Sequence, residues 1–356
     1  MLEQAFRELG PHLAGSYRQL LGRELEPSPE LSSLHGDYLD YALLDRVMPR
    51  PILAYFGFHA ASDAVTFDDA DAIGDGLLLP QLLRDFLAIH DDIVDEDLDK
   101  FGASPLPVTF SGPDELAALT KQGKDLALFY GDLLIAILFK VAQSQPAPAG
   151  PALVSLITQT LYTNQRGQLA ELLAEQRPLS ATTVEDVLLI GERKAAHYCY
   201  EFPFSVGAIL AGHSDLLVAP VRDLLLRIGT ASQVIDDITG AFPHVIDDDK
   251  DTLGEIIHLR RTIPLVLLAQ ARPPRHISHL LEAKPPLQPA QALVLRDYMY
   301  EHGVPAQASR ICQRMVSGIH GRFDELPTGP ALAAYLRDLV HHRLVAPLNR
   351  LNARTT

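Results

Sequence analysis

The 356-residue chain contains no tryptophan, two cysteines and relatively few basic residues. Cys199 and Cys312 lie far apart and form no CxxC pair, so neither a disulfide framework nor a zinc site is indicated, and we expect both thiols to be buried. The 30 Lys and Arg residues are outnumbered by 45 Asp and Glu residues, which gives a net charge of −15. A surface that binds nucleic acid needs clustered cations, so this composition excludes nucleic acid as a partner.

Long hydrophobic runs are also missing. No stretch approaches the roughly 18 uncharged apolar residues of a membrane span, and the first residues lack the basic start and apolar core of a secretory signal. We therefore expect no stable membrane insertion and a cytoplasmic location. Hydrophobic residues still make up 47% of the chain, which is ample for a packed core.

The spacing of the apolar residues predicts helices nearly throughout, with little of the strict alternation that indicates strands. Three segments are apolar on more than one face, as in helices at the centre of a bundle: 77–89, 126–141 and 153–173. The Pro-rich segment 146–151 predicts a loop, and Thr182–Glu185 has the Thr-x-x-Glu form of a helix capping box. No linker is long enough to separate domains, so we expect one all-α domain over residues 1–356.

An acidic cluster directly follows the apolar segment 77–89. On a helix, residues four apart share a face, so Asp91 and Asp95 would project together, with Asp92 beside them. Like charges at this spacing repel, and a hard divalent cation relieves the repulsion; oxygen ligands with positions left for water and phosphate oxygens suit Mg²⁺. Taken alone, the cluster could equally be a solvated acidic end of a helix.

A second acidic pair changes that balance. Asp236 and Asp237 follow another apolar segment, 224–235, and lie 145 positions downstream of the first pair. Two such helix ends facing each other would form a cage for a metal-bound diphosphate. Six of the 45 acidic residues lie in 91–99 and seven in 236–255, and these windows hold only one of the 30 basic residues, so the net charge of −15 is largely local.

With this pair of motifs, the sequence resembles the trans-isoprenyl diphosphate synthases of the polyprenyl synthetase family, which includes farnesyl and geranylgeranyl diphosphate synthases. The resemblance runs from about Arg46 to Pro264. Its supporting matches, in the family's order, are Gly131-Asp132, Gly167-Gln168 with Glu171, Lys194, Gln233, Lys250 and the Arg-Arg-Thr-Ile-Pro-Leu stretch at 260–265. The resemblance implies an all-α, isoprenoid synthase-type helical bundle around a deep central cavity, three Mg²⁺ ions and a homodimer.

The activity that the resemblance implies is that of a prenyltransferase, which condenses an allylic prenyl diphosphate with isopentenyl diphosphate. The catalytic residues it implies are Asp91, Asp92, Asp95, Lys194, Asp236 and Asp237. Among them, Asp91, Asp95 and Asp236 would be the metal ligands. The allylic diphosphate would be bound by Lys100, Lys194 and Lys250, with Gln233 orienting the second cluster.

The departures from the family pattern fall mostly on the isopentenyl diphosphate side. The family's Gly-Gly-Lys-x-x-Arg-Pro segment corresponds to 45–51 here; its Arg is kept as Arg50, and its Lys is replaced by Val47. The second Arg after the first motif is replaced by Phe101, and the Thr after Lys194 by Ala195. This side of the site is therefore altered.

Arg84 aligns with a family His or Gln that contacts isopentenyl diphosphate. An Arg deep in an apolar helix either pairs with an acid such as Asp85 or faces a diphosphate. We favour the diphosphate, because the guanidinium fork suits phosphate oxygens. Arg46, Arg50 and Arg84 would then bind isopentenyl diphosphate.

Product length is indicated by Phe86 and Leu87, because in the family the bulk of the residues five and four positions before the first Asp limits the growing chain. One aromatic there suggests a C15 to C20 product. Two alternative functions stay open. One is an isoprenyl synthase-like class I terpene synthase that ionises a single prenyl diphosphate, and the other is a non-catalytic subunit that binds a prenyl diphosphate or a partner.

Overall fold

The computed structural model describes residues 1–25, 31–43, 47–96, 98, 103–112, 119–213, 219–242 and 253–355. Within these residues the chain is all-α, as predicted, and has no β-strand. It divides into two compact units. Unit 1 comprises Met1–Thr158, Phe202–Leu217 and Thr328–Leu332, and unit 2 comprises Gln159–Glu201, Val218–Pro327 and Ala333–Thr356. That the chain acts as one domain stays a prediction.

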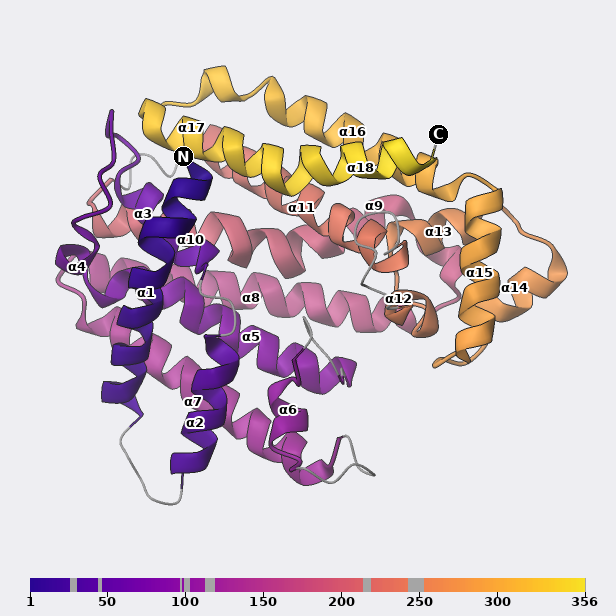
Figure 1. Ribbon diagram of the computed structural model, residues 1–356, viewed down its shortest axis with the longest axis horizontal. Helices are drawn as coiled ribbons and strands as arrows, with labels where there is room; N and C mark the ends of the chain where they lie inside the picture. The colour runs from indigo at the N-terminus through magenta and orange to yellow at the C-terminus, as the bar shows by residue number, and fades with distance from the viewer. Residues whose placement is uncertain are drawn as a thin grey trace. The chain divides into compact units, whose positions relative to one another are not determined.

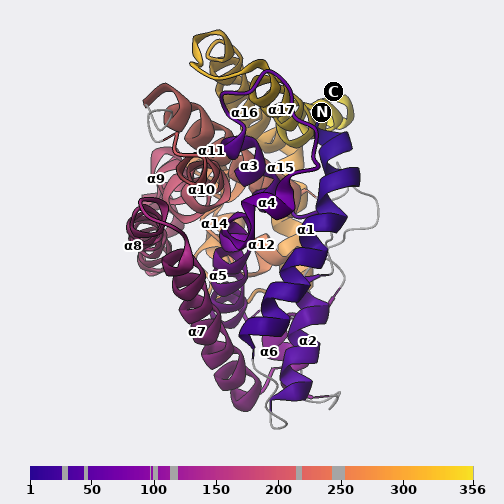
Figure 2. The same cartoon turned by 90° about the vertical axis from the view of Figure 1, so that its left-hand side faces the viewer.

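Unit 1 carries the first acidic cluster. Its elements are α1 (Leu2–Glu24), α2 (Ser32–Ala42), α3 (Pro49–Phe58), α4 (Ala70–Ile73), the 3₁₀ turn η1 (Asp75–Leu78), α5 (Leu79–Asp95), α6 (Leu106–Thr109), α7 (Lys121–Ser144) and α10 (Phe202–Leu210). Helix α5 packs along α7, and α3 packs on α10 (Figures 1 and 2). The core of the unit is rich in fully buried aromatic side chains, namely Tyr17, Tyr38, Tyr55, Phe56, Phe202 and Phe204.

Unit 2 carries the second acidic cluster. Two helices begin in unit 1 and continue into unit 2, namely α8 (Ala149–Glu175) and α17 (Pro330–Val340). The other elements are η2 (Leu179–Ala181), α9 (Val184–Gly191), the π-helical segment η3 (Glu192–Glu201), α11 (Ala219–Ala241), α12 (Gly254–Ile257), α13 (Ile263–Gln270), α14 (Arg275–Leu281), α15 (Pro289–Glu301), α16 (Val304–His320), η6 (Phe323–Glu325), the π-helical segment η7 (His341–Val345) and α18 (Ala346–Thr355). Helix α11 packs against η3 and α16.

The helices that bear the clusters arise where the apolar pattern predicts them. The segment 77–89 spans the end of η1 and most of α5, and Pro80 is tolerated because the first turn of a helix needs no intrahelical N–H bond. Helix α5 ends at Asp95, because the next residue, Glu96, has a left-handed φ of 54° that stops the helix just beyond the acidic cluster. The segments 126–141 and 153–173 lie within α7 and α8, which confirms both helices.

Two local expectations need correction. The capping box lies one residue later than predicted: the Thr183 hydroxyl accepts from the Asp186 N–H at 3.1 Å, and the Asp186 carboxylate accepts from the Thr183 N–H at 2.9 Å. The predicted loop 146–151 is also shorter, because α8 already begins at Ala149. Proline is compatible with the first turn of a helix, so Pro151 does not prevent this start.

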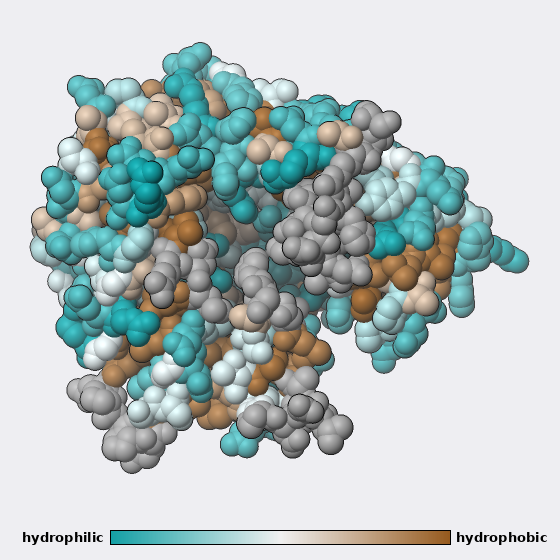
Figure 3. All heavy atoms as spheres, viewed as in Figure 1, coloured by the Kyte–Doolittle hydropathy of each residue, from teal (hydrophilic) through white to brown (hydrophobic). Residues whose placement is uncertain are grey.

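The surface shown in Figure 3 is mostly polar, with smaller apolar areas between the polar side chains. Among the residues that the structure describes, no helix is both long enough and apolar enough to cross a membrane. Cys312 is buried, as expected, whereas Cys199 is only half-buried. The expectation of two buried thiols is therefore wrong for Cys199, which lies in the π-helical segment η3.

Candidate active site

The first acidic cluster occupies the last two turns of α5. Asp92 is fully buried, whereas Asp91 and Asp95 are half-buried and share a helix face, as the spacing predicts. The carbonyl end of a helix carries partial negative charge, and the last turn of α5 holds no basic residue. Helix stability therefore does not explain three carboxylates here, and a cation would relieve their repulsion.

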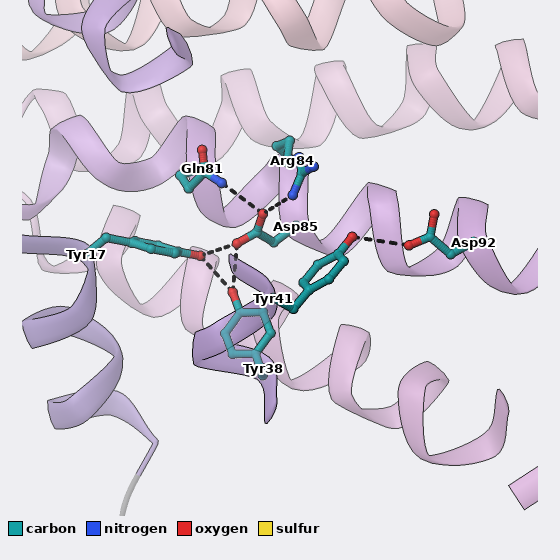
Figure 4. A network of polar contacts seen from close by, with 7 residues as sticks. All are labelled: Tyr17, Tyr38, Tyr41, Gln81, Arg84, Asp85 and Asp92. Carbon is teal, nitrogen blue, oxygen red and sulfur yellow. Dashed lines mark hydrogen bonds and ion pairs between the residues drawn. The ribbon is translucent and has the colours of Figure 1, made fainter. Parts of the chain in front are cut away.

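The buried carboxylate of Asp92 is held by a residue from another helix. The hydroxyl of Tyr41, at the end of α2, donates to Asp92 Oδ2 at 3.1 Å (Figure 4). Burial raises the pKa of Tyr41, so its phenol stays protonated and remains a donor. Tyr41 thus orients one carboxylate of the cluster.

Two turns before Asp92, α5 carries a second buried carboxylate, that of Asp85, which is fully inaccessible. Its Oδ2 accepts from the hydroxyls of Tyr17 and Tyr38, each at 2.8 Å (Figure 4). Its Oδ1 accepts from Gln81 Nε2 and Arg84 Nη1, each at 2.9 Å. Four donors from α1, α2 and α5 therefore satisfy the carboxylate and fix α5 against these helices.

Arg84 pairs with Asp85, the alternative that we ranked second from the sequence. Its guanidinium also lies over the Tyr41 ring, 5.8 Å from the centroid. The Arg84 side chain is 21% exposed, so it is not sealed in the core. Whether it also binds isopentenyl diphosphate stays a prediction, but part of its charge is already neutralised inside the protein.

Gly131, in the family-like Gly131-Asp132 pair, lets α7 approach α5 at the cluster. A Cβ at this position would lie 2.9 Å from His90 Nε2, so a larger residue would displace the histidine. His90 packs on Phe86 with ring centroids 4.4 Å apart. Burial lowers the pKa of His90, and Asp132 opposes that shift only partly, so the imidazole next to Asp91 is mostly neutral at pH 7. Phe86 and its neighbour Leu87 are both buried.

For the other residues of this region predicted to bind diphosphate, the structure describes position and burial at most. Arg50 is half-buried in the first turn of α3, and Val47 lies just before that helix. Arg46 and Lys100 lie outside the described residues, as does Lys250 further along the chain.

The second acidic cluster lies near the end of α11 and repeats the pattern of the first. Asp236 is exposed, and the next residue, Asp237, is buried. Gln233, one turn earlier, donates from Nε2 to Asp237 Oδ1 at 2.9 Å. Burial, reinforced by the charge of Glu255, raises the pKa of Asp237 well above its usual range. Of the two carboxylates, Asp236 is therefore the one that solvent and ligands reach.

A cation that the sequence did not indicate lies beside this cluster. Arg343, in the π-helical segment η7, places Nη2 3.4 Å from Asp236 Oδ2. The two residues are 107 positions apart and belong to no shared motif, so no sequence pattern could have linked them. The same holds for Tyr41 and Asp92, which are 51 positions apart.

Lys194, predicted to bind the allylic diphosphate, lies in the π-helical segment η3. Its ammonium is 2.6 Å from Glu171 Oε2 on α8, and its carbonyl accepts from Asn164 Nδ2 at 2.6 Å. A Cβ on Gly167 would lie 2.6 Å from the Lys194 backbone nitrogen, so this glycine permits the close approach of α8 to η3. The family-like residues Gly167, Glu171 and Lys194 therefore form one local arrangement in unit 2.

The donor set fits magnesium in kind. The candidate ligands are all carboxylate oxygens, the hard donors that Mg²⁺ prefers. Asp91 and Asp95 are half-buried and Asp236 is exposed, and they lie toward the carboxyl ends of their helices, where added positive charge is favourable. Among the residues that the structure describes, no three His, Cys, Asp or Glu side chains form a ready-made metal site. Mg²⁺ is commonly held by one or two carboxylates together with water and substrate phosphates, so such sparse protein ligation suits this ion.

Comparison with known proteins identifies the family. The polyprenyl synthetase family model matches residues 48–293, which is more than half of the chain. The chain belongs to the polyprenyl synthetase family. It is 26% identical over 190 residues to the geranylgeranyl diphosphate synthase of Sulfolobus acidocaldarius, covering 52% of this chain and 53% of that protein. It is 26% identical over 222 residues to the (2E,6E)-farnesyl diphosphate synthase of Mycobacterium bovis, covering 61% and 55%. The chain thus spans about half the length of these curated relatives.

Solved structures of this family share the fold over nearly the whole chain. A geranylgeranyl pyrophosphate synthase from Corynebacterium glutamicum, complexed with isoprenyl diphosphate and magnesium, superposes with a TM-score of 0.79 at 19% identity, covering 95% of this chain and 98% of that one. The geranylgeranyl pyrophosphate synthase of Lactobacillus brevis gives a TM-score of 0.76 at 20% identity, covering 97% and 99%. At this identity the likeness establishes the fold, and the activity has to be argued from the residues.

Proposed function

We propose that this protein is a Mg²⁺-dependent prenyltransferase that condenses an allylic prenyl diphosphate with isopentenyl diphosphate. The observation that carries the proposal is the repeated pattern at the ends of α5 and α11, where an accessible aspartate precedes a buried aspartate held by a neighbouring side chain. Membership of the polyprenyl synthetase family supports the reaction class.

In the proposed reaction the allylic C–O bond breaks, and its electron pair leaves with the diphosphate. The allylic carbon then bonds to the terminal alkene carbon of isopentenyl diphosphate, and loss of a proton forms the new double bond. When bound, Mg²⁺ would draw electron density from the diphosphate and make it a better leaving group. We assign Asp91, Asp95 and Asp236 as the metal ligands, and the family resemblance implies three Mg²⁺ ions.

The other predicted site residues would bind and orient the substrates. Asp92 and Asp237 are buried and would support the accessible carboxylates beside them. Lys194, positioned by Glu171, would bind the allylic diphosphate together with Lys100 and Lys250, and Gln233 would keep Asp237 in place. Phe86 and Leu87 would limit the product to C15 to C20.

The proposal includes a homodimer, and exposed apolar side chains support it. Helix α7 exposes Leu128, Phe129 and Leu133, with Phe129 70% accessible. Helix α8 separately exposes Tyr162 and Leu169. Contiguous large apolar side chains at a protein surface are typical of interfaces with other chains.

A second candidate function is favoured by Arg84 and Val47. Arg84 is paired with a fully buried carboxylate, and Val47 replaces the family's lysine, so the anion-binding capacity for isopentenyl diphosphate is reduced. A class I terpene synthase, which ionises one prenyl diphosphate and lets water or an internal double bond capture the cation, would not need that capacity.

One assay separates these functions. The purified protein is incubated with Mg²⁺ and geranyl or farnesyl diphosphate, with and without labelled isopentenyl diphosphate. We expect label in a longer prenyl diphosphate. A hydrocarbon or alcohol formed without isopentenyl diphosphate would establish the terpene synthase instead, and no turnover under either condition would indicate a non-catalytic binding subunit.

A further inference from the structure

The contact between Arg343 and Asp236 places a cation directly at the second acidic cluster. Arg343 Nη2 lies 3.4 Å from Asp236 Oδ2, and both side chains are about half accessible, at 45% and 52%. Arg343 belongs to η7, the π-helical segment before the last helix, and η7 packs on α11. π-Helical turns are uncommon and occur frequently at functional sites.

A buried tyrosine lies close to the guanidinium. The charge of Arg343 interacts with Tyr200, whose hydroxyl lies 2.7 Å from Ser232 Oγ. Ser232 and Asp236 are four residues apart, so they lie on the same face of α11. Arg343 and Tyr200 therefore both lie beside the turn of α11 that carries the accessible aspartate.

The ion pair itself is weak enough to exchange. It rests on one N–H to carboxylate contact at 3.4 Å between two half-exposed side chains, without the two parallel bonds of a strong guanidinium pair. A divalent cation interacts more strongly with the same carboxylate oxygen. Metal at Asp236 would therefore release the Arg343 guanidinium from this contact, while the packing of η7 on α11 keeps it nearby.

We propose that Arg343 is a further diphosphate-binding residue, which pairs with Asp236 in the metal-free protein and with an oxygen of the diphosphate once Mg²⁺ occupies that carboxylate. This inference rests on the proposed function. The planar guanidinium matches phosphate oxygens, and the exchange keeps both the carboxylate and the guanidinium paired in each state. Arg343 would thus link metal binding at the second cluster to diphosphate binding.

Arg337 offers a matched control on the preceding helix, α17. Its guanidinium is 52% exposed and lies 3.2 Å from Asp324 Oδ1, so Arg337→Gln removes a cation of similar exposure and partnership. Asp324 lies in η6 and is not part of either acidic cluster. Loss of general positive charge would affect both variants equally, whereas a specific role would affect Arg343 alone.

The test is calorimetric titration of the full chain with inorganic diphosphate at saturating Mg²⁺, for wild type, Arg343→Gln, Arg343→Lys and Arg337→Gln. We expect Arg343→Gln to weaken diphosphate binding by roughly tenfold or more, Arg343→Lys to recover part of the loss, and Arg337→Gln to stay within about twofold of wild type. Titration with Mg²⁺ alone should show equal or tighter binding to Arg343→Gln, because a competing cation has been removed. Circular dichroism melting curves establish that each variant is folded.

The outcomes distinguish the two proposals. If wild type binds diphosphate with Mg²⁺ and Arg343→Gln binds it equally well, this inference is wrong and the proposed function stands. Equal losses in Arg343→Gln and Arg337→Gln would also overturn it. If wild type shows no Mg²⁺-dependent binding of diphosphate, the proposed function fails and this inference fails with it.

Discussion

The two acidic clusters share a pattern and differ in how it is supported. At the end of α5, Asp92 is held by Tyr41 from α2, whereas at the end of α11 Asp237 is held by Gln233 from the same helix. The accessible carboxylate of the second cluster also pairs with Arg343. The first cluster therefore depends on contacts between helices, and the second depends on its own helix and on a half-exposed cation.

This difference leads us to expect that the two clusters respond differently to metal binding. A buried carboxylate fixed by a neighbouring helix keeps the turn that carries the proposed ligands in place, which lowers the reorganisation needed when metal binds. A carboxylate paired with an arginine has to exchange partners, which makes metal binding there responsive to the diphosphate. We expect substitutions in the first cluster to affect stability and activity together, and those in the second to affect activity and ligand binding more than stability.

The largest expected effect is on catalysis, and it should be similar for the two clusters. Asp91→Asn and Asp236→Asn should each lower kcat/KM by roughly four orders of magnitude, about 5 kcal/mol, because each removes the charge of a proposed ligand of the catalytic metal. Steady-state prenyltransfer assays measure this. Asp223→Asn, a surface carboxylate of α11 that pairs with Arg227 and Arg322, serves as the control and should retain activity. A large loss in only one cluster would break the comparison.

The next largest effect concerns the network beneath the first cluster. Asp85→Ala leaves four buried or half-buried donors without their acceptor, so it should lower the free energy of unfolding by roughly 3 to 5 kcal/mol. Urea denaturation measures the change. Asp75→Ala is the control, because Asp75 forms a half-exposed pair with Arg23 and should cost less than about 1 kcal/mol. Equal small costs for both variants would show that the network does not anchor α5.

The third prediction compares how much the hydrogen-bond donors to the two buried aspartates, Asp92 and Asp237, contribute to stability. Tyr41→Phe removes a donor from Asp92 and should cost about 1 to 2 kcal/mol of unfolding free energy. Gln233→Leu should cost less, because the raised pKa of Asp237 makes its neutral form more accessible. Tyr162→Phe, on an exposed tyrosine, is the control for loss of a hydroxyl. A larger cost for Gln233→Leu than for Tyr41→Phe would reverse the assignment of support.

The smallest effect is a pH dependence at the second cluster, measured in chelator. The pKa of Asp237 is higher in the folded chain than in the unfolded chain, so this group favours folding at low pH and loses that contribution as pH rises through its folded pKa. Asp237→Asn removes the titration and keeps an acceptor for Gln233. The variant should therefore be more stable than wild type at pH 7.5, with the difference shrinking toward pH 4. A difference independent of pH would contradict the shifted titration.

The sequence predicts those parts of the site that local patterns determine. Apolar periodicity followed by carboxylates places the clusters at the ends of α5 and α11, because helix periodicity and the exit from the core are local properties. Contacts that depend on tertiary packing are not predictable in this way. Tyr41 reaches Asp92, and Arg343 reaches Asp236, only because separate helices fold against each other.

The partner of Arg84 is not predictable from the sequence of its own helix. A guanidinium suits phosphate, and this favoured a diphosphate partner, but the sequence does not show that Tyr17 and Tyr38 converge on the adjacent Asp85. The hydrogen bonds from these tyrosines offset the desolvation cost of the buried Asp85 carboxylate. That carboxylate in turn gives Arg84 a partner inside the protein. The π-helical segments η3 and η7 were likewise absent from the prediction, since apolar periodicity does not separate them from α-helix.

The central claim is that the carboxylates of each cluster are required for Mg²⁺-dependent binding of diphosphate. The most direct measurement is calorimetric titration of inorganic diphosphate at saturating Mg²⁺ into wild type, Asp91→Ala and Asp236→Ala. We predict one diphosphate bound per chain in wild type and loss of that binding in either variant. Wild-type affinity in Asp91→Ala or in Asp236→Ala, or two sites per chain of which each variant loses one, would contradict the claim.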